Sequence, residues 1–156
     1  MIELATNNKK VQLKFGLKVL LKTNREFGSI HEGQKQDDGG SRIYMDLATG
    51  SDNKLVEFIK LCAPDKLTDD EVIEMLENYM DVNGVEYEEI FNLFMDELNE
   101  SRFFSKKIND TIKLLEKQQE AQRETAPEKA EELEYMLGLL KRKKSLKTVP
   151  EQESQI

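Results

Sequence analysis

Asp81, Asn83 and Gly84 have the order and spacing of part of a calcium-binding EF-hand loop. Such a loop places oxygen ligands at positions 1, 3, 5 and 9, a glycine at position 6 and a bidentate glutamate at position 12. With Gly84 at position 6, position 1 is Tyr79 and position 12 is Ile90. Neither side chain binds calcium, so the sequence predicts a turn between two helices, in which Gly84 lets the backbone reverse direction.

The single histidine and the single cysteine do not suggest a catalytic pair. His31 lies in a polar stretch, whereas Cys62 lies on the apolar side of a predicted helix, so we expect an exposed imidazole and an inert, buried thiol. The glycines form no phosphate-binding loop, and the many carboxylates recur on the outer sides of predicted helices, as solvated side chains do. The sequence therefore predicts a protein that is not an enzyme and that uses no cofactor or metal.

Charge is unevenly distributed along the 156 residues, whose formal net charge is −8. Residues 65–100 hold thirteen Asp and Glu but one basic residue, Lys66, while residues 1–26 hold six basic residues and two acids. The acidic middle would repel phosphates, so we expect no nucleic-acid partner. No apolar run approaches the ~18 residues of a membrane-spanning helix. The N-terminus lacks a signal-peptide pattern, and we expect a cytoplasmic protein without a membrane partner.

The apolar periodicity predicts a mainly helical (α+β) fold. Ile2 and Leu4 alternate with polar residues, and Val11 and Leu13 resume the alternation after a turn, which indicates a β-hairpin. Residues 28–41 are polar and glycine-containing and are predicted as a loop, and residues 42–48 form a short helix or strand. Helical spacing predicts the remaining elements, at residues 17–27, 53–62, 67–80 and 86–100 and from about residue 105. In the first of these, Leu17, Leu20 and Leu21 are expected on the apolar side, opposite a solvated stripe of Lys14, Lys18 and Lys22.

Two predicted helix starts carry the spacing of a capping box. Thr68 is followed by Glu71, and Thr125 is followed by Glu128 around Pro127, which the first helical turn accepts. We therefore predict a compact core of an N-terminal β-hairpin and about five helices over residues 1–115. A helical extension over residues 116–144 and a disordered tail over residues 145–156 follow.

Two groups of apolar residues are candidates for protein contacts. Phe103 and Phe104 follow the acidic helix and either pack as core under the next helix or meet a partner. The helix at residues 127–144 carries an apolar stripe that must cover something. It either folds back on its own domain, pairs with a second copy, or docks on a partner. The stripe contains Leu133, Met136, Leu137 and Leu140.

The segment "KKVQLKFGLKVLLKTNREFG", residues 9–28, resembles the opening of the tail assembly chaperones of long-tailed (siphovirus-type) phages and prophages of Gram-positive bacteria. Those proteins begin with a short hairpin and then an L-K-F-G-L-K-like stretch that enters a helix, which here is Leu13 to Lys18. The later order of a polar loop, a helix that ends near a proline, and two acidic helices joined at Gly84 also matches. The resemblance covers residues 1 to about 115.

The resemblance implies a role in virion morphogenesis. Such chaperones are thought to bind the helical tape measure protein and keep it soluble until tail tube subunits polymerise around it. A frameshift-extended form is thought to recruit the tail tube protein. Because covering a long client needs many copies, we expect a homo-oligomer. We hypothesise that client or self contacts involve Phe103, Phe104, Leu133, Leu137 and Leu140. The alternative is an acidic DNA mimic or adaptor that binds a basic protein.

Overall fold

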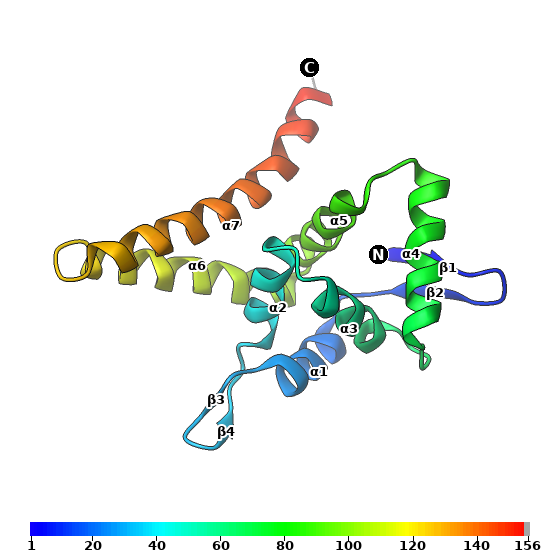
Figure 1. The fold of residues 1–156 in the computed structure, drawn as a ribbon, viewed down its shortest axis with the longest axis horizontal. Coiled ribbons are helices and arrows are strands. Elements are labelled where there is room, and N and C mark those ends of the chain that lie inside the picture. The colour runs from blue at the N-terminus through cyan, green and yellow to red at the C-terminus, as the bar shows by residue number, and fades with distance from the viewer. Residues whose placement is uncertain (155–156) are drawn as a thin grey trace.

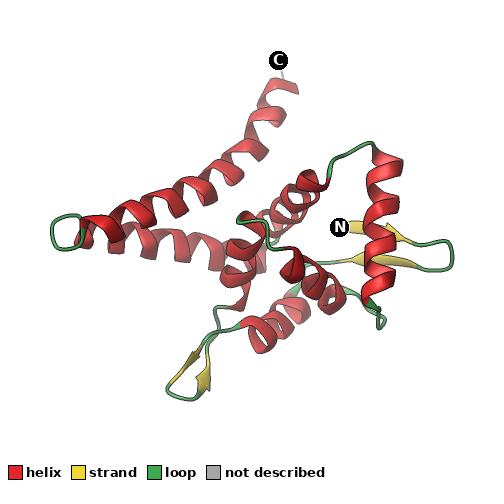
Figure 2. Ribbon diagram, in the orientation of Figure 1, coloured by secondary structure: helices red, strands yellow, loops and turns green. Residues whose placement is uncertain are grey.

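The computed structural model describes the backbone of residues 1–154 and the side chains of residues 1–141. Over these residues the fold is mainly helical, with two short β-hairpins, as the sequence predicted (Figures 1 and 2). The elements, in chain order, are β1 (Ile2–Ala5), β2 (Lys10–Leu13), α1 (Leu17–Phe27), β3 (Ile30–His31), β4 (Gln34–Lys35), α2 (Gly39–Ala48), α3 (Asp52–Cys62), α4 (Asp69–Asn83), α5 (Tyr87–Glu100), α6 (Arg102–Gln122) and α7 (Pro127–Ser154).

The predicted N-terminal hairpin is confirmed as an antiparallel pair. Ile2 lies opposite Leu13 and Leu4 lies opposite Val11, and all four side chains are buried. Helix α4 packs on β1, and the Asn78 side-chain amide donates a hydrogen bond of 3.0 Å to the Ala5 carbonyl. The hairpin is thus held to the helices by its buried side, as its alternating pattern requires.

The helices share one apolar core, and most of its stripes follow the predicted spacing. On α5 every residue of the predicted stripe is buried, and α3 likewise buries its four predicted positions, Cys62 included. On α4 the inner three residues of the stripe are buried, whereas Tyr79 and Met80 are half-buried beside the core. The 3.6-residue period therefore predicted the inward sides of these helices correctly.

The predicted loop over residues 28–41 is wrong at both ends. Its first part forms the β3–β4 hairpin, and α2 begins at Gly39, the first of two adjacent glycines that in the sequence favour a loop. Gly39 lies so close to α1 that a Cβ atom there would collide with the Thr23 carbonyl. The Asn24 side chain also accepts a 3.0 Å hydrogen bond from the Gly39 amide. The glycine serves close helix packing, which local sequence patterns do not distinguish from a turn.

Helices α6 and α7 lie against each other and project from the other helices (Figure 1). Helix α6 begins at Arg102, slightly before the predicted start near residue 105. Helix α7 continues to Ser154, past residue 144, where the sequence predicted its end, and residues 155–156 lie outside the described residues. The proposed division into a core, an extension and a disordered tail stays a prediction.

Thr125 does not cap α7. Because Pro127 is the first helical residue, the N-cap position falls on Ala126, whose carbonyl accepts a hydrogen bond from the Ala130 amide. The Thr125 hydroxyl instead donates to the Ala121 carbonyl at 3.4 Å, at the end of α6. The capping-box spacing at residues 125–128 is offset by one residue from the actual helix start.

Candidate protein-binding surfaces

The predicted contact residue Phe104 lies at the centre of the core and is 0% exposed. Its ring lies edge-on to the ring of Phe58, at a centroid distance of 6.4 Å, and Phe58 also contacts Phe15 and Phe94. The start of α6 is fixed nearby by Ser101. Its hydroxyl donates to the Phe15 carbonyl at 2.6 Å and accepts from the Phe104 amide at 3.4 Å. Phe104 therefore packs as a core residue and does not face a partner.

The neighbouring Phe103 is half-buried at the edge of the core. The guanidinium of Arg102 lies 4.9 Å from the centre of its ring, which is a cation–π distance. Because it is only half-buried, the Phe103 ring remains partly accessible. Nothing in the sequence distinguishes it from its buried neighbour Phe104.

Helix α7 folds back on its own domain, which was one of three open alternatives for its apolar stripe. Leu137 is 4% exposed and Leu140 is 1% exposed, and both belong to the core, while Leu133 is half-buried. Lys141 pairs with Glu116 of α6 at 2.8 Å. Apolar contacts with α2, α5 and α6 hold the first part of α7, and the exposed ion pair adds little to them.

The five predicted contact residues do not form one surface. The Glu116–Lys141 pair shows which residues lie opposite each other in the antiparallel α6–α7 hairpin. In this register Leu133 lies near the turn, while Phe103 lies at the opposite end of α6, on the order of 30 Å away along the helix axis. Three of the five are buried, so only Phe103 and Leu133 present partial surface. Their role in contacts with other proteins stays a prediction.

Exposed apolar side chains outside the five predicted contact residues lie on α1 and α4. Leu17 and Leu21 are 49% and 50% exposed, and Ile73 is 46% exposed. On α1 the buried side is formed by Val19, Leu20 and polar residues, so Leu17 and Leu21 lie beside the lysines instead of opposite them. The period identified a helix correctly, but a helix with several adjacent leucines can turn either side inward.

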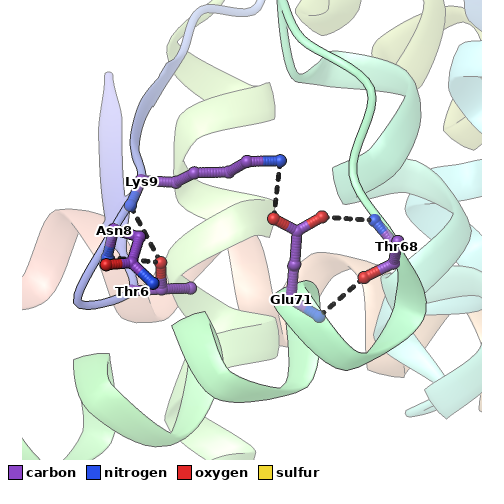
Figure 3. A network of polar contacts seen from close by, with 5 residues as sticks. All are labelled: Thr6, Asn8, Lys9, Thr68 and Glu71. Carbon is purple, nitrogen blue, oxygen red and sulfur yellow. Dashed lines mark hydrogen bonds and ion pairs between the residues drawn. The ribbon is translucent and has the colours of Figure 1, made fainter.

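Two capped helices present the acidic surface. The Thr68 hydroxyl accepts a hydrogen bond from the Glu71 amide at 3.1 Å, and the Glu71 carboxylate accepts from the Thr68 amide at 3.0 Å (Figure 3). This confirms the predicted capping box. The Lys9 ammonium, 2.6 Å from Glu71, is the main cause of the lowered pKa of that carboxyl group (Figure 3). On α5 the Glu86 amide donates to the Glu89 carboxylate at 3.3 Å, while the Glu89 amide donates to the Glu86 backbone carbonyl at 3.0 Å.

The residues first considered for chemistry occupy structural positions. Gly84 ends α4 in the left-handed conformation, with φ of 63°, and Ile90 is 1% exposed. The segment is the predicted helix–helix turn. Cys62 is buried, and burial raises the pKa of its thiol. His31 is exposed on β3, with Nε2 3.9 Å from the Glu32 carboxylate. Among the described residues, no group of His, Cys, Asp and Glu is arranged to hold a metal ion.

Comparison with known proteins identifies a family that this chain matches. The model of a family described as phage tail assembly chaperone protein, TAC, matches residues 3–113, from β1 to the middle of α6. No curated protein and no solved structure matches the chain. None of the helices in the described part of the chain combines the length and the apolar character that crossing a bilayer requires.

Proposed function

The chain belongs to the phage tail assembly chaperone family, and on this basis we propose that it binds the tape measure protein and keeps it soluble while the tail tube assembles. The family match is the observation that carries the proposal, since it covers 111 of the 156 residues. The proposed setting is the cytoplasm of a bacterial host that carries a long-tailed phage or prophage. The tail tube protein is a second proposed partner, recruited through a frameshift-extended form.

The surface of the structure suits such a role. The partly exposed Phe103 and Leu133 offer apolar contacts to a helical client, which are the contacts that helix-in-groove recognition uses. Exposed acids on α4 and α5 would keep a complex of chaperone and client soluble. Both features support binding as the activity of the protein.

The five hypothesised contact residues divide into two groups under this proposal. Phe103 and Leu133 are accessible to a client in the structure as it stands. Phe104, Leu137 and Leu140 would contact a client only after α7, or α6 with it, separated from the core. Serine at Phe103 or Leu133 should therefore weaken client binding without unfolding the chain. The matched control is Leu114→Ser on α6, since Leu114 is 55% exposed and lies outside the hypothesised set.

The alternative of an acidic adaptor or DNA mimic is favoured by one observation. Helices α4 and α5 together contain no Lys or Arg, and most of their acids are exposed. Binding of a basic protein through this surface would be mainly electrostatic, whereas binding of a tape measure helix would bury apolar area.

Salt dependence separates the two functions. Binding of the purified chain to overlapping peptides of the tape measure protein should persist between about 0.05 M and about 0.5 M salt, where exposed charge pairs are increasingly screened. The serine variants at Phe103 and Leu133 should bind more weakly at both concentrations. If no peptide binds, or if binding disappears at the higher salt and ignores both serine variants, the adaptor function replaces the chaperone function.

A further inference from the structure

Helix α1 presents a basic, partly apolar surface with no partner in the described chain. We call Leu17, Lys18, Leu21, Lys22 and Arg25 the α1 face, because their helical positions fall within one side of the helix. The two leucines are half exposed, and none of the three cations has an ion-pair partner among the described residues. Exposed leucines flanked by unpaired cations suit a partner that is acidic and apolar.

The α1 face lies between two surface hollows. A hollow of about 720 Å³ lies between α1 and the end of α3, with Lys22 and Arg25 on its rim and Phe27, Leu61 and Pro64 among its apolar lining. A smaller hollow of about 290 Å³ adjoins Leu21 and Arg25 on the other side. These hollows have room for side chains of a second helix that lies along α1.

The larger hollow also contains acids, whose partners limit their effect. Glu57 pairs with Lys54 at 3.3 Å, and the rim residue Lys60 pairs with Asp69 at 2.7 Å. Glu26 and Asp65 lie on the lining without an ion pair among the described residues. Asp37 lies on the lining of the smaller hollow, but Lys35 lies there too and Lys66 lies on the larger one, so positive charge is still in excess around the α1 face.

Helix α4 presents the complementary surface on another edge of the fold (Figure 1). We call Asp70, Ile73, Glu74, Glu77 and Asp81 the α4 face, because they follow one another at helical spacing and all are exposed. None of the four acids forms an ion pair among the described residues. Ile73, at 46% exposure, adds an apolar contact to this acidic side.

We infer that the α1 face of one copy of this chain binds the α4 face of the next copy. Each face pairs exposed apolar residues with unpaired charges, and the charges have opposite sign. The two helices have comparable length, since α1 has 11 residues and α4 has 15. Ile73 of one copy packs against Leu17 and Leu21 of the next, and its acids lie opposite Lys18, Lys22 and Arg25.

The two faces belong to different helices, so one contact leaves a free face at each end of the pair. Such a heterologous contact repeats head to tail and builds a ring or an open chain. The client can then contact the remaining surfaces of many copies at once. This contact between copies is independent of which client the protein binds.

The experiment measures the mass of the purified full chain by light scattering, with charge-reversal variants. Wild-type protein at low salt should exceed its monomer mass of 18.1 kDa, in a concentration-dependent way, and should dissociate as salt is raised. Lys22→Glu with Arg25→Glu, and separately Glu74→Lys with Glu77→Lys, should weaken association about tenfold or more, because like charges then oppose each other. Lys113→Glu with Lys117→Glu is the matched control, since both residues are exposed on α6, and it should associate like wild type.

The decisive experiment mixes the α1 variant with the α4 variant. Each variant retains one intact face, and the two reversed faces also have opposite charges, so the α1 variant and the α4 variant together should regain the association of wild type. A chain that carries both reversals has opposite charges again and should associate like wild type. Recovery in these two arms also shows that the variants are folded.

Three results would overturn the inference. They are a wild-type chain that is monomeric at every concentration and salt, a face variant that associates like wild type, and a mixture that stays monomeric. Because the chain is measured alone, each of these results leaves binding to the tape measure protein untouched. Loss of client binding by a chain that still associates would contradict the proposed function alone.

Discussion

Replacement of Leu140 by alanine tests whether α7 is part of the folded core, although the family match ends at residue 113. Leu140 is 1% exposed, so the substitution removes apolar atoms that are fully packed. Buried Leu→Ala changes cost about 2–5 kcal/mol, depending on how far the site can collapse. Helix α7 packs on the outside of the fold and can adjust, so we expect about 3 kcal/mol for Leu140→Ala.

Such a loss is large beside the total stability of a domain, which is typically about 5–15 kcal/mol. For a chain of this size it corresponds to a Tm lower by roughly 6–12 °C. The assay is urea unfolding followed by far-ultraviolet circular dichroism, with Tyr135→Ala as the control on the same helix. Tyr135 is 73% exposed, so its loss should change the free energy of unfolding by no more than about 0.5 kcal/mol.

A change of less than about 0.5 kcal/mol for Leu140→Ala would refute the reasoning, because it lies within the range of surface substitutions. Helix α7 would then be separate from the core in solution. Its apolar stripe, with Leu133, Leu137 and Leu140, would be free for a client or for a second copy.

Three further predictions concern residues with defined partners. Thr68→Ala removes the hydroxyl half of the α4 capping box and should lower the free energy of unfolding in urea by about 1 kcal/mol. Thr125→Ala is the control, because it removes no cap and should change the free energy of unfolding little. The buried thiol of Cys62, whose pKa is raised by burial, should react with a maleimide much more slowly in the native chain than in urea, and equal rates would contradict its burial. Burial, together with the hydrogen bond to Asp52, raises the pKa of Tyr87 to about 12. The neutral phenol therefore stabilises the fold fully below the unfolded pKa near 10, and this contribution is lost as the pH rises to about 12. Over that window the wild type should lose more stability in urea than Tyr87→Phe does, and parallel losses would refute the assignment.

The sequence predicted elements well where one local signal decided them. The hairpin at Ile2–Leu13 follows from alternation, and the start of α4 follows from the Thr68–Glu71 spacing. The turn predicted at Gly84 is the left-handed end of α4, and α5 begins three residues later. In each case a backbone requirement and a side-chain pattern point to the same structure.

Errors arose where tertiary packing decided the outcome. Gly39 begins a helix because α1 needs close approach there, and no residue near it in the sequence records that need. Phe103 and Phe104 are adjacent in sequence, but the rotation of α6 buries the second and leaves the first accessible. The sequence likewise predicts Leu17 and Leu21 on the inner side of α1, whereas the structure exposes both.

The candidate surfaces were harder to predict than the fold, because a protein-binding surface has no fixed chemistry. Uneven charge along the chain was visible in the sequence, but the α1 face and the α4 face require knowledge of which side of each helix points outward. The predicted contact residues followed apolar periodicity, which identifies the core first. Three of the five therefore proved to be core residues.

Co-expression with the tape measure protein of the same phage or prophage tests the proposed chaperone function most directly. The measurement is the fraction of tape measure protein in the soluble lysate, followed by the mass of the co-purified complex. We predict that the client is insoluble alone, becomes soluble with this chain, and elutes with several copies of it. A client that stays insoluble when this chain is abundant and folded would contradict the proposed function.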